Sequence, residues 1–465
     1  MGLLSHLGGA TRKRLILVAC ILGSTIVFVD STVVNVALPA IQKDLGGGLA
    51  LQQWVVDAYL LTLGSLILVG GSLGDLFGRK RIFAIGVASF GVTSVLCALA
   101  VSGPMLIVAR GLQGVAGALL TPAALATITA VFSGEERGAA IGTWTAWTGI
   151  AFVIGPLVGG WLVSVGSWRS IFLINVPFTI VTLALVWVAL PGRDLTRERA
   201  RVDVVGGLLC VLGLGGPVYA LIEAPNRGFT DPLILASLFG GLAFLGAFVY
   251  WELHHDQPML PLRLFRLRNF TFANVETFAV YAALSTLTFF LVLFLQQIAG
   301  YSPFRSGLAT VPITFVMFFL SPRVGRLSMR LGPRFFMGVG PLICAAALLW
   351  IRELSPGFDY WTELLPPLLL FAVGLSLVVA PLTSTVLADA GERDAGIASG
   401  VNNAIARVAG LLGIAVVGAA IASSENALDL PGYRQAMAIT AVLIGVGGVI
   451  GLAGIRNHPR VEARG

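Results

Sequence analysis

The sequence predicts an all-α integral membrane protein with fourteen transmembrane helices, arranged as two six-helix bundles with two further helices inserted between them. Hydrophobic residues make up 57% of the 465 residues and charged residues only 11%, whereas a soluble globular protein is about 25% charged. The apolar residues form separate runs, most of which reach the roughly 20 residues that a helix needs to cross a bilayer. The basic residues gather in alternate connections between these runs.

The apolar runs define the predicted helices in chain order. These helices span residues 15–38, 54–73, 82–101, 104–132, 138–163, 170–190, 204–222, 233–251, 270–298, 307–322, 335–351, 364–388, 395–421 and 436–455. The tenth and eleventh runs are the shortest. An even number of spans places both termini on the same side of the membrane.

The lysine and arginine residues test this number of helices, because cytoplasmic loops carry an excess of both. If the N-terminus is cytoplasmic, 22 of the 30 basic residues fall in cytoplasmic segments, six in external segments, and two, Arg110 and Arg407, within helices. A wrong number of helices would destroy this asymmetry. We therefore predict a multi-pass protein of the cytoplasmic membrane, with both termini in the cytoplasm.

The chain contains an internal repeat. Gly-containing basic segments follow the second and tenth helices, as GSLGDLFGRKR (71–81) and SPRVGRLSMRLGPR (321–334). We predict an N-terminal bundle over residues 1–192, cytoplasmic linkers with two inserted helices over 193–268, and a C-terminal bundle over 269–465. Repeats of this kind are common in secondary transporters, whose substrate site lies between the repeats near the middle of the membrane.

Several classes of function find no support in the sequence. A phosphate-binding loop of the form GxxxxGK[ST] requires a Gly-Lys pair, but none of the three lysines, Lys13, Lys43 and Lys80, follows a glycine. We find neither a His and Cys cluster with metal-ligand spacing nor a nucleophile with a base. We therefore expect no enzymatic activity, ATP hydrolysis, metal or other cofactor. Because the basic residues lie in short loops, we also expect no nucleic-acid partner.

The basic segment after the second helix carries a candidate gate. Gly74 and Gly78 permit a tight helix end and the close approach of another helix. Asp75 lies where the helix dipole disfavours an anion, so it needs a positive partner, either Arg79 or the N-terminus of the thirteenth helix. The segment resembles the signature loop of the major facilitator superfamily, which implies a latch on a cytoplasmic gate. The alternative is a basic loop that only sets the topology.

The fifth helix contains a stretch rich in glycine and proline, WTGIAFVIGPLVGGWL. Gly155, Gly159 and Gly160 remove side-chain bulk, which lets helices approach closely in lipid, and Pro156 interrupts the backbone hydrogen bonds. Ordinary helix packing is one interpretation. GPLVGG also resembles the antiporter motif of exporters in the superfamily, which implies outward transport.

Three further stretches resemble the fourteen-spanner drug:proton antiporters, the EmrB-like and QacA-like group. They are DSTVVNVALPAI in the first helix, QQIAGYSPFRSGLATVP (296–312) and GIASGVNNAIARVAG (396–410). The resemblance covers essentially the whole chain. It implies a transporter that works as a monomer in the lipid bilayer, is driven by the proton gradient without a cofactor, and exports small lipophilic molecules.

A carboxylate in the first helix needs a partner, because a charge at the bilayer centre costs about 2.5–3.5 kcal/mol. At ~1.5 Å per residue, Asp30 lies about 22 Å and Arg110 about 21 Å above the cytoplasmic face. We therefore expect the two side chains to approach each other, directly or through water. Arg110 belongs to RGLQGVAGALLTP, which resembles the fourth-helix motif of the superfamily, whose arginine is implicated in proton transfer. The alternative is a static pair that only fixes helix packing.

Other polar residues within the helices are candidates for the same cavity. Glu276 has no evident basic partner, which favours its protonated form, so it is either a proton carrier or a residue in a water-filled vestibule. Asp57 is an accessory site or a vestibule residue. Arg407, Asn402 and Asn403 give the thirteenth helix a polar face, which either lines the cavity or forms hydrogen bonds across helices.

The preferred function is a proton-coupled exporter of small lipophilic or cationic molecules or drugs, which works by alternating access. Trp144, Trp147 and Tyr281 suit such substrates, although aromatic residues are also common on lipid-facing surfaces. The alternatives are an importer or facilitator of a polar nutrient, an exporter of a dedicated endogenous metabolite, and a membrane receptor or scaffold that transports nothing. A proton flux that depends on substrate would exclude the last.

Overall fold

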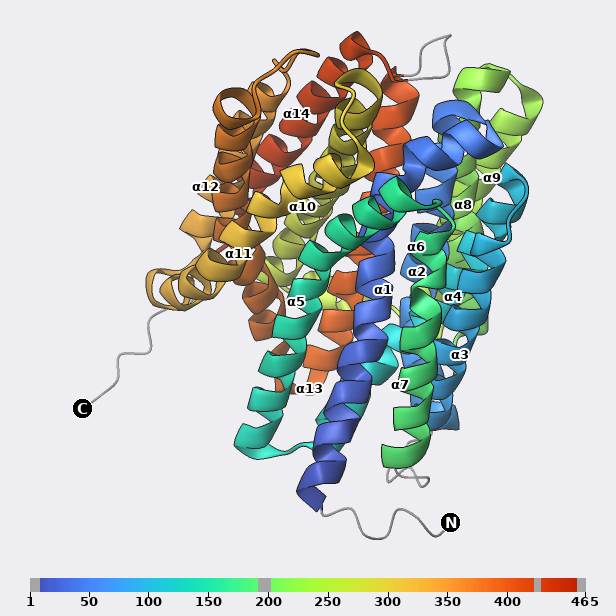
Figure 1. Cartoon of the computed structure of the whole chain (residues 1–465). Helices are drawn as coiled ribbons and strands as arrows, with labels where there is room; N and C mark the ends of the chain where they lie inside the picture. Colours follow the sequence, from blue (N-terminus) through green and yellow to red (C-terminus); the bar gives the residue numbers. More distant parts are fainter. Residues whose placement is uncertain (1–8, 191–201, 422–427, 458–465) are drawn as a thin grey trace.

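The computed structural model describes residues 9–190, 202–421 and 428–457, except for the side chains of residues 152, 153, 392 and 393. This part of the chain forms fourteen helices that are long and apolar enough to cross a membrane, and it contains no β-strand (Figure 1). The predicted number of spans and the all-α class are therefore confirmed. The predicted boundary at residues 192–193 and the basic residues Arg193, Arg197, Arg199, Arg201, Arg460 and Arg464 lie outside the described residues.

The N-terminal bundle contains six spans, the last of which is divided into α6 and α7. Its helices are α1 (Gly9–Leu45), α2 (Gly48–Phe77), α3 (Arg79–Ala98), α4 (Gly103–Val131), α5 (Gly134–Val165), α6 (Ser170–Leu173) and α7 (Asn175–Ala189). Two inserted spans follow, α8 (Val204–Arg227) and α9 (Pro232–His254).

The C-terminal bundle contains the remaining six spans. Its elements are the short η1 (Leu262–Arg266), α10 (Arg268–Leu293) with η2 (Phe294–Ile298), α11 (Pro303–Leu331), α12 (Pro333–Ile351), η3 (Tyr360–Leu364), α13 (Leu365–Ile421) and α14 (Leu430–Gly454). A kink at Gly391, where φ is 72°, divides α13 into two spans. Successive spans cross in opposite directions, so α1 begins and α14 ends on the same side. We call this the terminus side and the opposite one the far side.

The helices extend beyond the apolar runs by one or two turns at many ends. The first run, predicted as 15–38, is helical over Gly9–Leu45, and the tenth, predicted as 307–322, over Pro303–Leu331. Polar residues at these ends continue the helix into the membrane interface, where no hydrophobic signal marks them. The two repeated basic segments are therefore largely helical, which corrects their interpretation as loops.

The repeated segments end in the same way in both bundles. α2 ends at Gly78, where φ is 98° and the N–H donates to the Gly74 carbonyl. α11 ends at Gly332, where φ is 91° and the N–H donates to the Ser328 carbonyl. This backbone conformation favours glycine, and the next helix begins at once in each case. The shared geometry supports the predicted repeat.

Hydrogen bonds join the two bundles near the far side. From α2, Gln53 Nε2 donates to the Ile414 carbonyl of α13 at 3.0 Å. Gln296 Nε2, in η2 directly after α10, donates to the Val36 carbonyl of α1 at 2.9 Å. These buried or half-buried bonds hold α1 and α2 against the C-terminal bundle on that side.

The inserted helices α8 and α9 pack closely through small residues. A Cβ at Gly241 would lie 2.9 Å from the Gly216 Cα and closer still to the ring of Pro217. Asp203 fixes the start of α8, because its Oδ1 accepts hydrogen bonds from the Gly206 N–H at 2.7 Å and from Trp251 Nε1 of α9 at 2.9 Å. The pair therefore forms its own hairpin beside α2.

This packing predicts opposite outcomes for two adjacent glycines of α9. Gly241→Ala places a methyl group against the backbone and ring of α8, so we expect it to destabilise the protein by about 1–3 kcal/mol. Gly240→Ala is the matched control, because a Cβ there meets nothing within 4 Å and alanine favours helix. Thermal unfolding in detergent should separate the two variants. Equal melting temperatures would contradict the close contact.

Candidate transport site

The charged residues Asp30 and Arg110 meet in the middle of the N-terminal bundle. Arg110 Nη1 lies 2.6 Å from Asp30 Oδ2, and the two side chains are 1% and 0% exposed. The expected approach of these residues is thus direct, without an intervening water. Equal depth in the membrane predicted this contact correctly, because α1 and α4 run antiparallel across the same thickness of membrane.

Uncharged side chains complete this buried network. Gln113 Nε2 donates to Asp30 Oδ1 at 3.0 Å, and Asn175 Nδ2 of α7 donates to the same oxygen at 3.1 Å. Both amides also donate to Ser94 Oγ of α3. The carboxylate therefore accepts bonds from α4 and α7 as well as its ion pair.

The guanidinium of Arg110 is satisfied in the same way. Its Nε donates to the Val55 carbonyl of α2 at 2.9 Å, and Nη1 also donates to Gln113 Oε1 at 2.7 Å. Its Cζ lies 4.3 Å from the centre of the Tyr59 ring. The network joins five of the six spans, and its burial makes it a structural core in this conformation.

The amide partners Gln113 and Asn175 and the hydroxyl of Ser94 were not predicted from the sequence. Gln113 could have been found, because residues three apart share one face of a helix and Gln113 follows Arg110 at that spacing. Asn175 gives no such signal, since it begins α7 directly after the break that ends α6. Its role depends on the tertiary fold.

Glu276 lies in α10, nearer the terminus side, and is completely buried. Its carboxyl faces α14, where a Cβ at Gly451 would lie 2.6 Å from Glu276 Oε2 and 2.9 Å from the Met337 carbonyl of α12. Neither carboxyl oxygen has a hydrogen-bond partner among the described residues. The residue is therefore enclosed in the C-terminal bundle and does not face a water-filled vestibule in this conformation.

Asp57 is also completely buried, and neither carboxyl oxygen has a partner among the described residues. The direction in which its side chain points follows from the contacts of the residues one turn before and one turn after it on α2. Gln53 bonds to Ile414 of α13, and Leu61 contacts Gly215 of α8. Asp57 therefore lies on the face of α2 that meets both the C-terminal bundle and the inserted helices.

The side chains of the three polar residues predicted on the thirteenth span contact different groups. Asn402 Nδ2 donates to Asn274 Oδ1 at 3.1 Å and to Thr277 Oγ1 at 2.7 Å, both on α10. Asn403 is exposed and donates to the Ser399 carbonyl of its own helix. Asn402 thus forms hydrogen bonds across helices, as one of the two interpretations expected. Arg407 points toward the N-terminal bundle, with its Cζ 5.6 Å from the Phe28 ring centre.

The gate motif lies on the terminus side and is partly exposed. Asp75 Oδ1 lies 3.3 Å from Arg79 Nη2, and Arg79 Nη1 donates to the Ala126 carbonyl at the end of α4 at 3.0 Å. Of the two partners expected for Asp75, the structure shows Arg79. A Cβ at Gly74 would meet nothing within 4 Å, so the expected close approach of another helix is not seen there, whereas Gly78 has the positive φ that ends the helix.

The glycines of the antiporter motif contact two different helices. Added Cβ atoms at Gly155 and Gly159 would collide with Thr32 and Val33 of α1. A Cβ at Gly160 would lie 2.6 Å from the Pro303 carbonyl oxygen of α11. The motif therefore brings α1, α5 and α11 together, and at Gly160 it forms part of the interface between the bundles.

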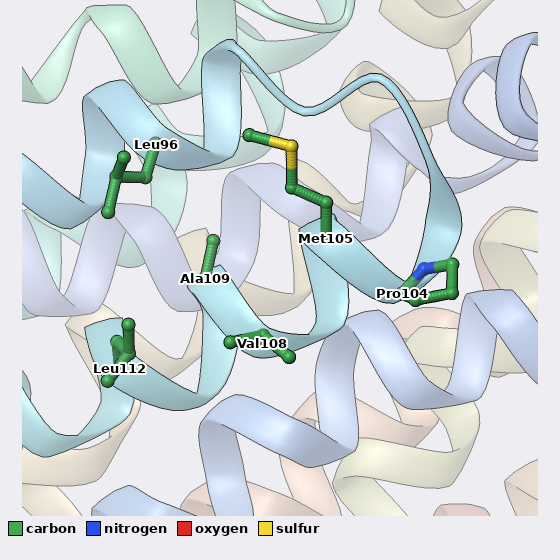
Figure 2. A pocket seen from close by; sticks show the side chains of 6 residues that line it. All are labelled: Leu96, Pro104, Met105, Val108, Ala109 and Leu112. Atoms are coloured by element: carbon green, nitrogen blue, oxygen red, sulfur yellow. The ribbon is translucent and has the colours of Figure 1, made fainter.

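One groove on the molecule is unrelated to these polar groups. Figure 2 shows it between the far ends of α3 and α4, where every lining side chain is apolar. The lining residues are Leu96, Pro104, Met105, Val108, Ala109 and Leu112. Arg110 and Gln113 of α4 are buried on the inner side of that helix, so we do not place the transport site in this groove.

Within the described residues, fourteen candidate spans in two repeated bundles, with ionisable groups between the helices, form the architecture of a polytopic membrane transporter. The model of the Major Facilitator Superfamily matches residues 20–414. The chain belongs to this superfamily.

Named relatives and a solved structure agree with this assignment. The puromycin resistance protein pur8 of Streptomyces alboniger is 38% identical over 86% of this chain and 80% of its own. The cephamycin export protein CmcT of Amycolatopsis lactamdurans is 35% identical over 88% of this chain and 85% of its own. The crystal structure of a bacterial homologue of the human lysosomal transporter Spinster, 20% identical, matches with a TM-score of 0.71 over 96% of this chain and 98% of its own. The last comparison shows the fold alone.

The buried ion pair predicts strong coupling between its two residues. Arg110→Gln leaves Asp30 buried without a counter-charge, which should cost about 3–5 kcal/mol of stability. We expect the double variant Asp30→Asn with Arg110→Gln to be more stable than either single variant. Thermal unfolding of the four proteins in detergent measures this coupling.

The exposed ion pair of Asp44 and Arg169, at 2.7 Å, is the matched control for this comparison of single and double variants. Its side chains are 46% and 34% exposed, so we expect a much weaker coupling than at the buried pair, because solvent screens the two charges. Additive effects at Asp30 and Arg110 would show that the buried pair is not a structural unit.

The close contact at Gly160 predicts that α5 and α11 close the far side of the protein. Gly160→Val should push α5 away from α11. Cysteines at positions 164 and 304 (Ser164→Cys and Phe304→Cys) report this separation, because the Phe304 N–H donates to Ser164 Oγ at 3.3 Å. We expect the valine variant to reduce their cross-linking by a short bismaleimide in membranes. Gly149→Val is the control, since a Cβ there meets nothing within 4 Å. Unchanged cross-linking in the Gly160 variant would contradict the contact.

Proposed function

We propose that this protein is a proton-coupled exporter of small lipophilic molecules, with its terminus side in the cytoplasm. The observation that carries this proposal is the enclosed carboxyl of Glu276, which has neither a donor nor a counter-charge among the described residues. At this depth such a group is stable only with its proton, so it can release the proton only when a conformational change brings water to it. That property suits a proton carrier.

The names of the relatives support outward transport. One is named as a resistance protein and another as an export protein, and both roles require removal of a compound from the cell. The alternative of nutrient import has no comparable support.

The proposed cycle uses the two bundles as rigid units that alternate about a central site. The far-side bonds of Gln53 and Gln296 break when the protein opens outward, and a proton enters from that side. Protonation allows the return to the inward-open state, in which the proton leaves to the cytoplasm and substrate binds again. Asp30 takes part only if this motion opens its network, because its carboxylate is enclosed here.

The proton gradient is large enough for useful export. One pH unit supplies about 1.4 kcal/mol per proton, and a potential of 100 mV supplies about 2.3 kcal/mol per charge. One proton that uses both could maintain roughly a 500-fold gradient of a neutral substrate. No cofactor is required for this mechanism.

Proteoliposomes that contain a pH-sensitive dye test the proposal. We expect lipophilic compounds to trigger proton movement with the wild-type protein, and Glu276→Gln to abolish it because the amide cannot carry a proton. Asp30→Asn tests whether the buried pair takes part. Glu353→Gln is the control, since Glu353 is 66% exposed in a far-side connection. Substrate-triggered proton movement that persists in Glu276→Gln would remove Glu276 from the coupling mechanism.

A further inference from the structure

Arg407 lies in the middle of the membrane between the two bundles. At ~1.5 Å per residue it is about 20 Å from Asp394, where the second span of α13 begins. Its Cβ lies 3.1 Å from the position that a Cβ of Gly64 would occupy on α2. Its Cζ is 5.6 Å from the centre of the Phe28 ring on α1. The side chain thus extends from the C-terminal bundle against two helices of the N-terminal bundle.

Within the part of the chain that the structure describes, the guanidinium of Arg407 has no counter-charge. Among the described residues we find no hydrogen bond or ion pair to it, and the side chain is partly exposed. Asp30 is not available, because Arg110 and two amides already occupy its carboxylate. The two arginines within the spans therefore differ, since one is fully paired and the other is not.

An unpaired arginine at this depth is costly and marks a substrate or ion pathway. The surroundings of Arg407 also include an aromatic ring, that of Phe28. A cation beside an aromatic ring complements a ligand that has an acidic group on an aromatic or apolar body.

We infer that Arg407 recognises the anionic group of an amphipathic substrate, a carboxylate or a sulfonate. This inference rests on the proposed function, because it places the substrate between the bundles at mid-membrane, as in other transporters built from repeats. A guanidinium binds such groups through two parallel hydrogen bonds. A cationic substrate would instead meet an uncompensated like charge, which disfavours the cationic option raised by the sequence.

Three probes that share one fluorophore test the inference with the full-length protein in detergent. Dansylglycine carries a carboxylate, dansylamide is neutral and dansylcadaverine carries an ammonium group. We expect dansylglycine to bind at least about tenfold more tightly than dansylamide, as a charge-assisted hydrogen bond implies, and dansylcadaverine to bind most weakly. Fluorescence titrations, corrected for empty micelles, give the Kd values.

Variants assign the preference to the side chain. Arg407→Gln should raise the Kd for dansylglycine to that for dansylamide and leave dansylamide unchanged, which also shows that the variant is folded. Arg407→Lys should retain part of the preference. Arg305→Gln is the control, because Arg305 is exposed and also lies over an aromatic ring, with its Cζ 4.9 Å from the Tyr301 centroid.

The inference is overturned if dansylglycine does not bind more tightly than dansylamide, which includes the case in which neither binds. A preference that survives Arg407→Gln also overturns it. These titrations need no proton gradient. Loss of proton coupling in liposomes with an intact anion preference would therefore refute the proposed export mechanism and leave the role of Arg407 standing.

Discussion

A charge within a bilayer needs a counter-charge or a proton, and the N-terminal bundle meets this requirement with the ion pair of Asp30 and Arg110. The pair is surrounded by amides, a hydroxyl and a backbone carbonyl, so that both charged groups are satisfied by protein. Because these partners come from five spans, the helices cannot move independently without exposing a charge to lipid. The pair therefore ties five of the six spans of the N-terminal bundle to one buried network.

Close packing between helices is the second constraint, and glycine provides it. In lipid the helices gain little from the hydrophobic effect, so their association depends on close approach. Gly155 and Gly159 fit α5 against α1 within the N-terminal bundle, whereas Gly160 fits it against α11 of the other bundle. One short motif thus contributes both to packing within the N-terminal bundle and to the contact between the two bundles.

The sequence predicted the number of spans, because apolar length is a direct requirement of the bilayer. It also predicted the contact of Asp30 with Arg110, because equal depth in antiparallel helices restricts the partners of a buried charge. It failed at the helix ends, where polar residues extend α1 and α11 beyond the apolar runs. It also could not find Asn175, because nothing local shows which side chain faces a carboxylate on another helix.

The remaining ionisable groups within the membrane divide by location. In the N-terminal bundle, the opposite charges of Asp30 and Arg110 neutralise each other, whereas Asp57 is buried without a partner among the described residues. Glu276 is enclosed in the C-terminal bundle, and Arg407 of the same bundle extends toward the other bundle; neither has a counter-charge among the described residues. A proton can neutralise the carboxyls of Asp57 and Glu276, but an arginine does not lose its charge, so an anion is needed to neutralise Arg407. Under the proposed function, the C-terminal bundle therefore holds one group suited to the driving ion and one suited to the cargo, which are the two functions that an antiporter must couple.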